Sequence, residues 1–179
     1  MTVAGPGPGT AAEVVAVLTE RGQTVAVAES LTGGLIAAAI TDVPGASMVF
    51  RGGVIAYATD IKRDLLGVDA ALLVDAGALD PRVAAAMAAG VRDRFAATFG
   101  VASTGVAGPD PQDGKPVGTV YLAVAGPGRT EVVASDLAPG DRSEIRRDTV
   151  AEALELLRRT LIGPVRPAGL PSGRPTGPA

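Results

Sequence analysis

Cysteine and histidine are absent from this chain of 179 residues. Their absence excludes disulfides, Ser-His-Asp and Cys-His catalytic sets, and the usual zinc sites with His or Cys ligands. Lysine is almost as scarce, because 14 of the 16 basic residues are arginines, which stay protonated near neutral pH. A serine nucleophile in this chain would have to pass its proton to a carboxylate or to one of the two lysines, Lys62 and Lys115.

Aromatic residues are few, and neither sign of charge is in large excess. Aromatics make up 3% of the chain and tryptophan is absent, so we expect a core of Ala, Val, Leu and Ile. The net charge is −3 and the arginines are scattered, so we expect no DNA or RNA partner. The first residues do not resemble a signal peptide, and no apolar run approaches the roughly 20 residues of a membrane span. These absences predict a cytoplasmic protein without a membrane partner.

The length suits one domain with a sizeable core. Glycine and proline crowd both ends, so residues 1–9 and 163–179 are predicted to be disordered tails around a domain at residues 10–162. Helices are predicted at 11–21, 31–41, from a cap at Thr59 or Asp60 to 66, 80–95 and from 141 onward, and strands at 24–28, 49–57, 99–103, 118–125 and 130–137. Helices alternate with strands early and strands follow one another late, which predicts a single three-layer α/β/α domain with a mixed sheet.

The most informative motif is Ala-Glu-Ser-Leu-Thr-Gly-Gly at residues 28–34, between a predicted strand and a predicted helix. Gly33 and Gly34 would let a substrate approach the backbone, and amides at the start of a helix can bind an anion or a developing oxyanion. In the alternative interpretation Ser30 is only a helix N-cap and the glycines only form a turn. Glycine at position 33, where a capping box has Glu or Gln, favours a catalytic or binding role.

Lys62 is the candidate base. It lies in the first turn of its predicted helix, where the helix dipole disfavours a cation by about 0.3–1 kcal/mol. Lowering a lysine pKa from about 10.4 to near 7 needs roughly 4–5 kcal/mol, so desolvation or a second cation would have to supply most of the shift. Tyr57 could orient Lys62 or relay a proton. In the alternative interpretation Lys62 is a solvated surface lysine and Tyr57 is a half-buried strand residue. We expect Lys115, which lies in a charged turn, to be exposed to solvent.

A second glycine-rich stretch, residues 103–109, also follows a predicted strand. The Thr104 hydroxyl and the amides near Gly105 and Gly108 could hold a phosphate, although the stretch matches neither the dinucleotide fingerprint nor the P-loop. Arg142 or Arg146, at the start of the last helix, could bind a phosphate through two hydrogen bonds. In the alternative interpretation this stretch is a loop without a ligand, and the two arginines are ordinary surface residues.

Taken together, the motifs closely resemble the CinA C-terminal family over about residues 10–162. The resemblance is carried by Glu-Ser-Leu-Thr-Gly-Gly at 29–34, Thr-Asp-Val-Pro-Gly-Ala-Ser at 41–47, Gly-Gly-Val-Ile-Ala-Tyr at 52–57, Lys62, Thr-Gly-Val-Ala-Gly-Pro at 104–109, Lys-Pro-Val-Gly-Thr-Val at 115–120 and Gly-Asp-Arg at 140–142. Members of the family are nicotinamide-nucleotide amidases, which hydrolyse the carboxamide of nicotinamide mononucleotide to nicotinate mononucleotide and ammonia in pyridine nucleotide salvage. The resemblance implies that Ser30 is the nucleophile, Lys62 its base and Tyr57 a supporting residue, with no metal or organic cofactor.

The resemblance also extends to the substrate, the assembly and the domain organisation. It implies a homodimer. It also implies the stand-alone form of the family, because the chain has no room for the molybdopterin-binding-like domain that some members carry at the N-terminus. Two stretches depart from the family pattern, namely Leu79-Asp80-Pro81 before the long helix and residues 110–114, where other members are glycine-rich. Substrate contacts are expected from Glu29, Thr32, Gly33, Gly34, Thr104, Gly105, Gly108 and Arg142.

Three other functions are compatible with these motifs. A nucleotide- or phosphate-binding module would use the same two glycine-rich loops without turnover. A serine-lysine amidase acting on another small amide would depend on Ser30 and Lys62 but not on a phosphate contact at Arg142. A scaffold or regulatory protein would keep only the fold.

Overall fold

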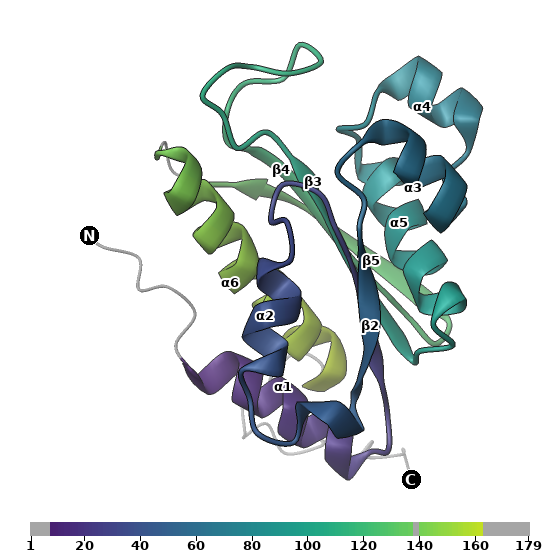
Figure 1. Cartoon of the computed structure of the whole chain (residues 1–179), viewed down its shortest axis with the longest axis vertical. Coiled ribbons are helices and arrows are strands. Elements are labelled where there is room, and N and C mark those ends of the chain that lie inside the picture. Colours follow the sequence, from purple (N-terminus) through teal and green to yellow (C-terminus); the bar gives the residue numbers. More distant parts are fainter. Residues whose placement is uncertain (1–7, 138–139, 163–179) are drawn as a thin grey trace, which may run out of the picture.

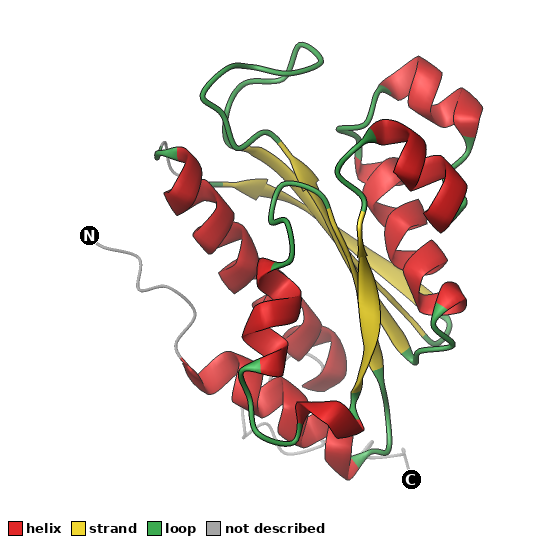
Figure 2. Ribbon diagram, viewed as in Figure 1, coloured by secondary structure: helices red, strands yellow, loops and turns green. Residues whose placement is uncertain are grey.

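A computed structural model describes residues 8–137 and 140–162 of the chain. Helices cover both faces of one five-stranded sheet (Figures 1 and 2), so the predicted three-layer α/β architecture with a mixed sheet is confirmed. No helix in this part of the chain is long and apolar enough to cross a membrane. The elements are α1 (Pro8–Glu20), β1 (Val25–Glu29), α2 (Leu35–Thr41), a short 3-10 helix (Ala46–Met48), β2 (Phe50–Ile55), α3 (Thr59–Leu66), α4 (Ala70–Ala76), α5 (Pro81–Arg94), β3 (Phe99–Gly105), β4 (Thr119–Gly126), β5 (Arg129–Asp136) and α6 (Arg142–Ile162).

The strand order β2-β1-β3-β4-β5 determines where a site can form. Strands β2, β1 and β3 are parallel, whereas β4 and β5 run antiparallel to their neighbours. After β1 the chain goes to β2 on one side, and it then crosses back to place β3 on the other side. In open α/β sheets, ligands bind outside the carboxyl ends of the strands at such a switch point. Here that crevice lies between the ends of β1 and β3.

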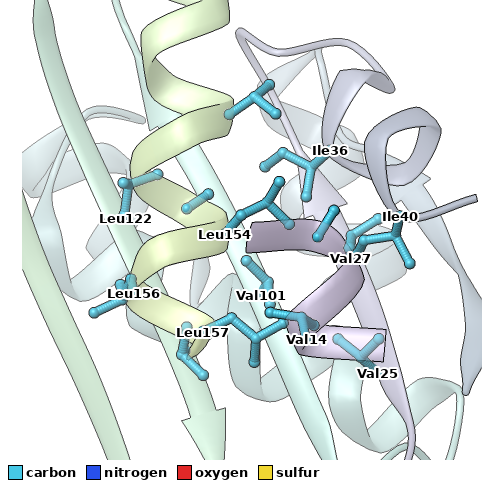
Figure 3. Close-up of a cluster of buried hydrophobic side chains, with 14 of the residues drawn as sticks. Val14, Val25, Val27, Ile36, Ile40, Val101, Leu122, Leu154, Leu156 and Leu157 are labelled. Atoms are coloured by element: carbon cyan, nitrogen blue, oxygen red, sulfur yellow. The ribbon is translucent and has the colours of Figure 1, made fainter. Parts of the chain in front are cut away.

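The two faces of β1 contribute to two different cores because successive side chains point to opposite faces. Val25 and Val27 pack with side chains of α1, α2 and α6, and Figure 3 shows this cluster with Ile36 and Leu154. Alanines, among them Ala26 and Ala28, form the other face, against which α3 and α5 pack. Small residues on this second face let the backbone of α5 approach the sheet closely.

Several predicted boundaries shift in the structure. Helix α2 begins at Leu35 rather than at residue 31, since residues 31–34 form turns. The predicted cap of α3 is wrong, because the N-cap is Ala58 and its side chain makes no capping bond, although Gly67 ends the helix as expected. Helix α4, capped by Asp69, was not predicted.

The predicted tails fall mostly outside the described residues. Helix α1 starts at Pro8, so Pro8 and Gly9 belong to the helix and not to the predicted tail. The remainder of both tails, residues 1–7 and 163–179, lies outside the part of the chain that the structure describes.

Candidate active site

Ser30 lies on a tight turn immediately after β1. Its amide donates a hydrogen bond to the carbonyl of Ser103 at 3.0 Å, which ties the turn to the neighbouring strand β3. The Gly33 amide donates back to the Ser30 carbonyl at 3.1 Å. Gly33 and Gly34 have φ values of +60° and +102°, which a residue with a side chain rarely adopts. The N-cap of α2 is Gly34, so the interpretation of Ser30 as a simple N-cap is wrong.

Glu29 is buried beneath this turn, with 1% of its surface exposed. Its carboxylate accepts hydrogen bonds from the amides of Gly34, Ile36 and Ala37 at 2.9, 3.0 and 2.8 Å. A carboxylate at a helix N-terminus satisfies amides that have no partner within the helix and interacts favourably with the dipole. The structure thus places Glu29 as a cap of α2 that holds the Ser30 turn, with its carboxylate turned to the helix.

The Lys62 side chain places its amine next to Ser30, and it is the only amine at the site within the described residues. Its Nζ lies 3.1 Å from Ser30 Oγ and donates to the Ala56 carbonyl at 2.7 Å. The side chain is 1% exposed, so the interpretation of Lys62 as a solvated surface residue is wrong. Desolvation by burial lowers the pKa of Lys62 from 10.5 to about 8, and the negative charge of Asp113 opposes part of this decrease. As expected from the small size of the helix-dipole effect, desolvation is the main cause.

Tyr57 and Arg142 lie at the rim of the site. The Tyr57 hydroxyl accepts a hydrogen bond from Arg142 Nη2 at 2.8 Å, and Arg142 Nη1 donates to the Gly108 carbonyl at 2.7 Å. Tyr57 is 61% exposed. Within residues 8–137 and 140–162, the Lys62 amine has only Ser30 and Ala56 as hydrogen-bond partners. The structure therefore brings Tyr57 to Arg142 and not to the Lys62 amine that it was expected to orient.

The two threonines expected to bind substrate are buried below the site. Thr32 Oγ1 and Ser103 Oγ lie 2.8 Å apart, and Thr104 Oγ1 donates to the Ala78 carbonyl at 2.9 Å. Neither threonine has exposed surface. These hydroxyls connect β1, β3 and the segment before α5, so in this structure they hold the site together.

The glycines of the second stretch are needed for close backbone packing. A Cβ atom at Gly105 would lie 2.6 Å from the Thr119 carbonyl oxygen. Gly108 has a φ of +82°, and a Cβ atom there would lie 2.9 Å from the Val117 side chain. The Gly108 carbonyl is also the anchor of Arg142.

A pocket opens above Ser30 and Lys62, and sequence reasoning missed several of the residues that line it. Ala78 and Leu79 belong to the segment before α5, and Ala107 and Gln112 belong to the loop between β3 and β4. Small or neutral residues of this kind carry no chemical signal in the sequence. The lining consists of Ser30, Leu31, Tyr57, Thr59, Lys62, Ala78, Leu79, Gly105, Ala107, Gln112 and Arg142.

Several backbone amides of the residues that line this pocket are not used in hydrogen bonds of the described residues, and those of Leu31 and Ala107 are among them. The amides of Gly33 and Gly34, which the sequence suggested as oxyanion donors, are bound to the Ser30 carbonyl and to Glu29. Over the same residues no group of three or more carboxylates could hold a metal ion.

Comparison with known families gives a match to the CinA C-terminal domain over residues 8–161. The chain belongs to the CinA family. A CinA-like protein from Frankia casuarinae is 55% identical over 163 residues, which cover 91% of this chain and 36% of that protein. A CinA-like protein from Gloeobacter violaceus is 52% identical over 149 residues. The chain spans about a third of the length of these curated relatives.

Solved CinA-family structures share the fold over most of the chain. The competence/damage inducible protein CihA from Agrobacterium tumefaciens has a TM-score of 0.84 and 39% sequence identity, covering 90% of this chain and 99% of that one. The competence damage-inducible protein A from Klebsiella pneumoniae has a TM-score of 0.83 and 32% identity, covering 87% and 97%. This chain thus shares its fold with these two solved structures.

The buried lysine makes the stability of this CinA protein depend on pH. The pKa of Lys62 is about 8 in the folded state and about 10.4 in an unfolded chain, so between these values the unfolded state binds more protons. The free energy of unfolding should therefore rise with pH across this window, by on the order of 2–3 kcal/mol from Lys62. Urea unfolding of wild type and Lys62→Met at pH 7.5 and pH 10 measures this difference. If both proteins respond identically to pH, the lysine is not desolvated as described.

Proposed function

We propose that this protein is a nicotinamide-nucleotide amidase that converts nicotinamide mononucleotide to nicotinate mononucleotide and ammonia. The observation that carries the proposal is the buried Lys62 amine, 3.1 Å from Ser30 Oγ, with its pKa lowered to about 8. A serine becomes a useful nucleophile when a base beside it can take its proton, and a desolvated lysine is such a base. Membership of the CinA family and the match of its motifs at Ser30, Tyr57 and Lys62 support the choice of substrate.

The first chemical step forms an acyl-enzyme. With Lys62 neutral, its two N–H bonds keep a donor for the Ala56 carbonyl, and its lone pair accepts the proton of Ser30. Ser30 Oγ attacks the carboxamide carbon and forms a C–O bond, which turns the carbonyl oxygen into an oxyanion. The free amides of Leu31 and Ala107 are the candidate donors to that oxygen.

The intermediate then collapses, and the C–N bond breaks. Lys62 returns its proton to the departing nitrogen, which leaves as ammonia. In the second half, Lys62 takes a proton from water, the water oxygen attacks the acyl carbon, and Lys62 returns that proton to Ser30 Oγ as the ester bond breaks. The products are Ser30 with its hydroxyl restored and nicotinate mononucleotide, whose carboxyl proton passes to solvent, so atoms and protons balance without a metal or an organic cofactor.

Arg142 is the proposed contact for the phosphate of the substrate. It lies at the rim of the pocket, where the nucleotide tail would emerge once the carboxamide reaches Ser30. Its guanidinium is exposed and can form paired hydrogen bonds with a phosphate. Binding would require it to give up its bond to Tyr57 or to Gly108.

Ammonia release from nicotinamide mononucleotide by the purified protein tests the proposal. We expect kcat/KM to rise with pH up to a plateau above about 8, because only neutral Lys62 can accept a proton. Below that value the rate should fall about tenfold per pH unit, since the neutral fraction falls in the same proportion.

One control substrate and one binding measurement separate the alternatives. Nicotinamide lacks the ribose phosphate, and equal turnover of it would favour an amidase for another small amide. Saturable binding of nicotinamide mononucleotide without ammonia release, unchanged in Ser30→Ala, would favour the nucleotide-binding module. A homodimeric cytoplasmic enzyme is part of the same proposal, and the molecular mass in solution checks the dimer.

A further inference from the structure

Arg146 reaches from α6 to the turn that carries Ser30. Its Nε donates to the Leu31 carbonyl at 3.0 Å and its Nη2 donates to the Thr32 carbonyl at 3.0 Å. The planar guanidinium group can donate to two such carbonyl oxygens at once, and a lysine ammonium fits this arrangement less well. The structure thus directs the Arg146 side chain at the protein backbone, whereas the sequence suggested a phosphate ligand.

Arg146 forms no ion pair within the described part of the chain. The side chain is half-buried, and at Gly33 a Cβ atom would lie 3.4 Å from Arg146 Nη2. At a partly buried position a charge acts more strongly on neighbouring dipoles than it would if water surrounded it fully.

A chain of hydrogen bonds leads from this charge to the pocket. Arg146 Nη2 binds the carbonyl of Thr32, and the peptide group of that carbonyl also contains the Gly33 N–H. The Gly33 N–H donates to the Ser30 carbonyl at 3.1 Å, whose peptide group contains the Leu31 N–H. Leu31 lines the pocket, and within residues 8–137 and 140–162 its amide has no acceptor. Hydrogen-bonded peptide groups polarise one another, so each link makes the next N–H a stronger donor.

We propose that Arg146 is a positioning residue that aligns and polarises the Leu31 amide as the donor to the oxyanion formed at Ser30. The inference rests on the proposed amidase function. The negative charge on the oxygen grows only toward the transition state, so the effect belongs to kcat and much less to KM. Arg146 acts through the backbone and does not touch the substrate.

Matched variants of two adjacent arginines test this role. In Arg146→Gln, kcat for ammonia release should fall about 10- to 100-fold with KM changed less than about threefold, below the roughly 100- to 1000-fold loss for a direct oxyanion donor. Arg146→Lys, which keeps the charge but loses the planar guanidinium group, should recover part of the rate. Arg147→Gln is the control, because Arg147 is exposed and no hydrogen bond or ion pair of its side chain occurs among the described residues. A rise in KM with unchanged kcat would overturn the inference and make Arg146 a substrate-binding residue.

The amide signal of Leu31 in a proton–nitrogen NMR spectrum provides a second measurement that needs no turnover. We expect the Leu31 proton to move upfield in Arg146→Gln and to stay in place in Arg147→Gln, because a less polarised N–H is more shielded. An unmoved signal overturns the inference even if the wild type is an amidase. If the wild type releases no ammonia, the proposed function fails, and the Leu31 signal still decides whether Arg146 polarises the turn.

Discussion

Ser30→Ala is expected to lower kcat for ammonia release by on the order of 10⁴-fold or more, while the variant stays folded and still binds nicotinamide mononucleotide. The reason is that in the proposed mechanism Ser30 Oγ forms the acyl bond, and among the described residues no other hydroxyl is hydrogen-bonded to the Lys62 amine. Lys62→Met should cause a loss of similar size, because a serine hydroxyl without a base to take its proton is a weak nucleophile. Combining both changes should cost little more than either one, since the two residues act as a unit.

The chain offers a matched control for each of these changes. Ser47→Ala removes an exposed hydroxyl in the short 3-10 helix, and Lys115→Met removes the other lysine of the chain. Both should retain wild-type turnover. Initial rates of ammonia release, with circular dichroism to check folding, make the measurement. More than a tenth of wild-type activity in purified Ser30→Ala would show that Ser30 is not the nucleophile.

Gly90→Ala is expected to destabilise the protein by about 3 kcal/mol or more, against the usual gain of about 1 kcal/mol for this change inside a helix. Helix α5 passes so close to the end of α3 that a Cβ atom at Gly90 would lie 1.9 Å from the Leu66 carbonyl oxygen. Backbone atoms cannot rotate away as a flexible side chain would, so one helix has to move. Helix α3 carries Lys62, and turnover should therefore fall along with stability.

The same substitution in an open position is the control. Gly9 lies in the first turn of α1, and within the described residues no atom outside its own helix backbone and chain neighbours lies within 4 Å of an added Cβ. Gly9→Ala should therefore be neutral or stabilise by up to about 1 kcal/mol. Urea unfolding of both variants gives the free energies to compare. A Gly90→Ala protein as stable as Gly9→Ala would mean that α3 and α5 are not in contact as described.

Many of the elements could be predicted because their signals are local. Pro81 following an N-capping Asp80 opened α5 where expected, and Gly67 in a left-handed conformation ended α3. The β-branched run before Ser30 formed β1, a fully buried strand between β2 and β3. Helix α4 was missed because it has no buried residues and therefore only a weak amphipathic pattern, although Asp69 supplied a capping signal.

Errors at the site arose where one segment binds another. Helix α2 starts at Leu35 because the carboxylate of Glu29 accepts hydrogen bonds from the amides of Gly34 and Ile36. In a helix that began at residue 31, the Ile36 amide would instead donate to a backbone carbonyl of the preceding turn. The amides proposed as oxyanion donors are those of Leu31 and Ala107 and not those of Gly33 and Gly34, because the glycine amides already have acceptors inside the turn. A sequence shows that these amides exist, but it does not show which of them stay free.

The order of the motifs along the chain was enough to recognise the CinA family. Because the chain has no histidine and no cysteine, the sequence also narrowed the candidate nucleophile and base to Ser30 and Lys62. Residue type and local propensity decide such matters, because they act within a few positions of the chain. The burial of Lys62, its contact with Ser30 and the reach of Arg146 to Leu31 come only from the folded molecule. Desolvation and hydrogen bonds between residues 32 or 115 positions apart depend on how β1, α3 and α6 pack, and no local pattern specifies that packing.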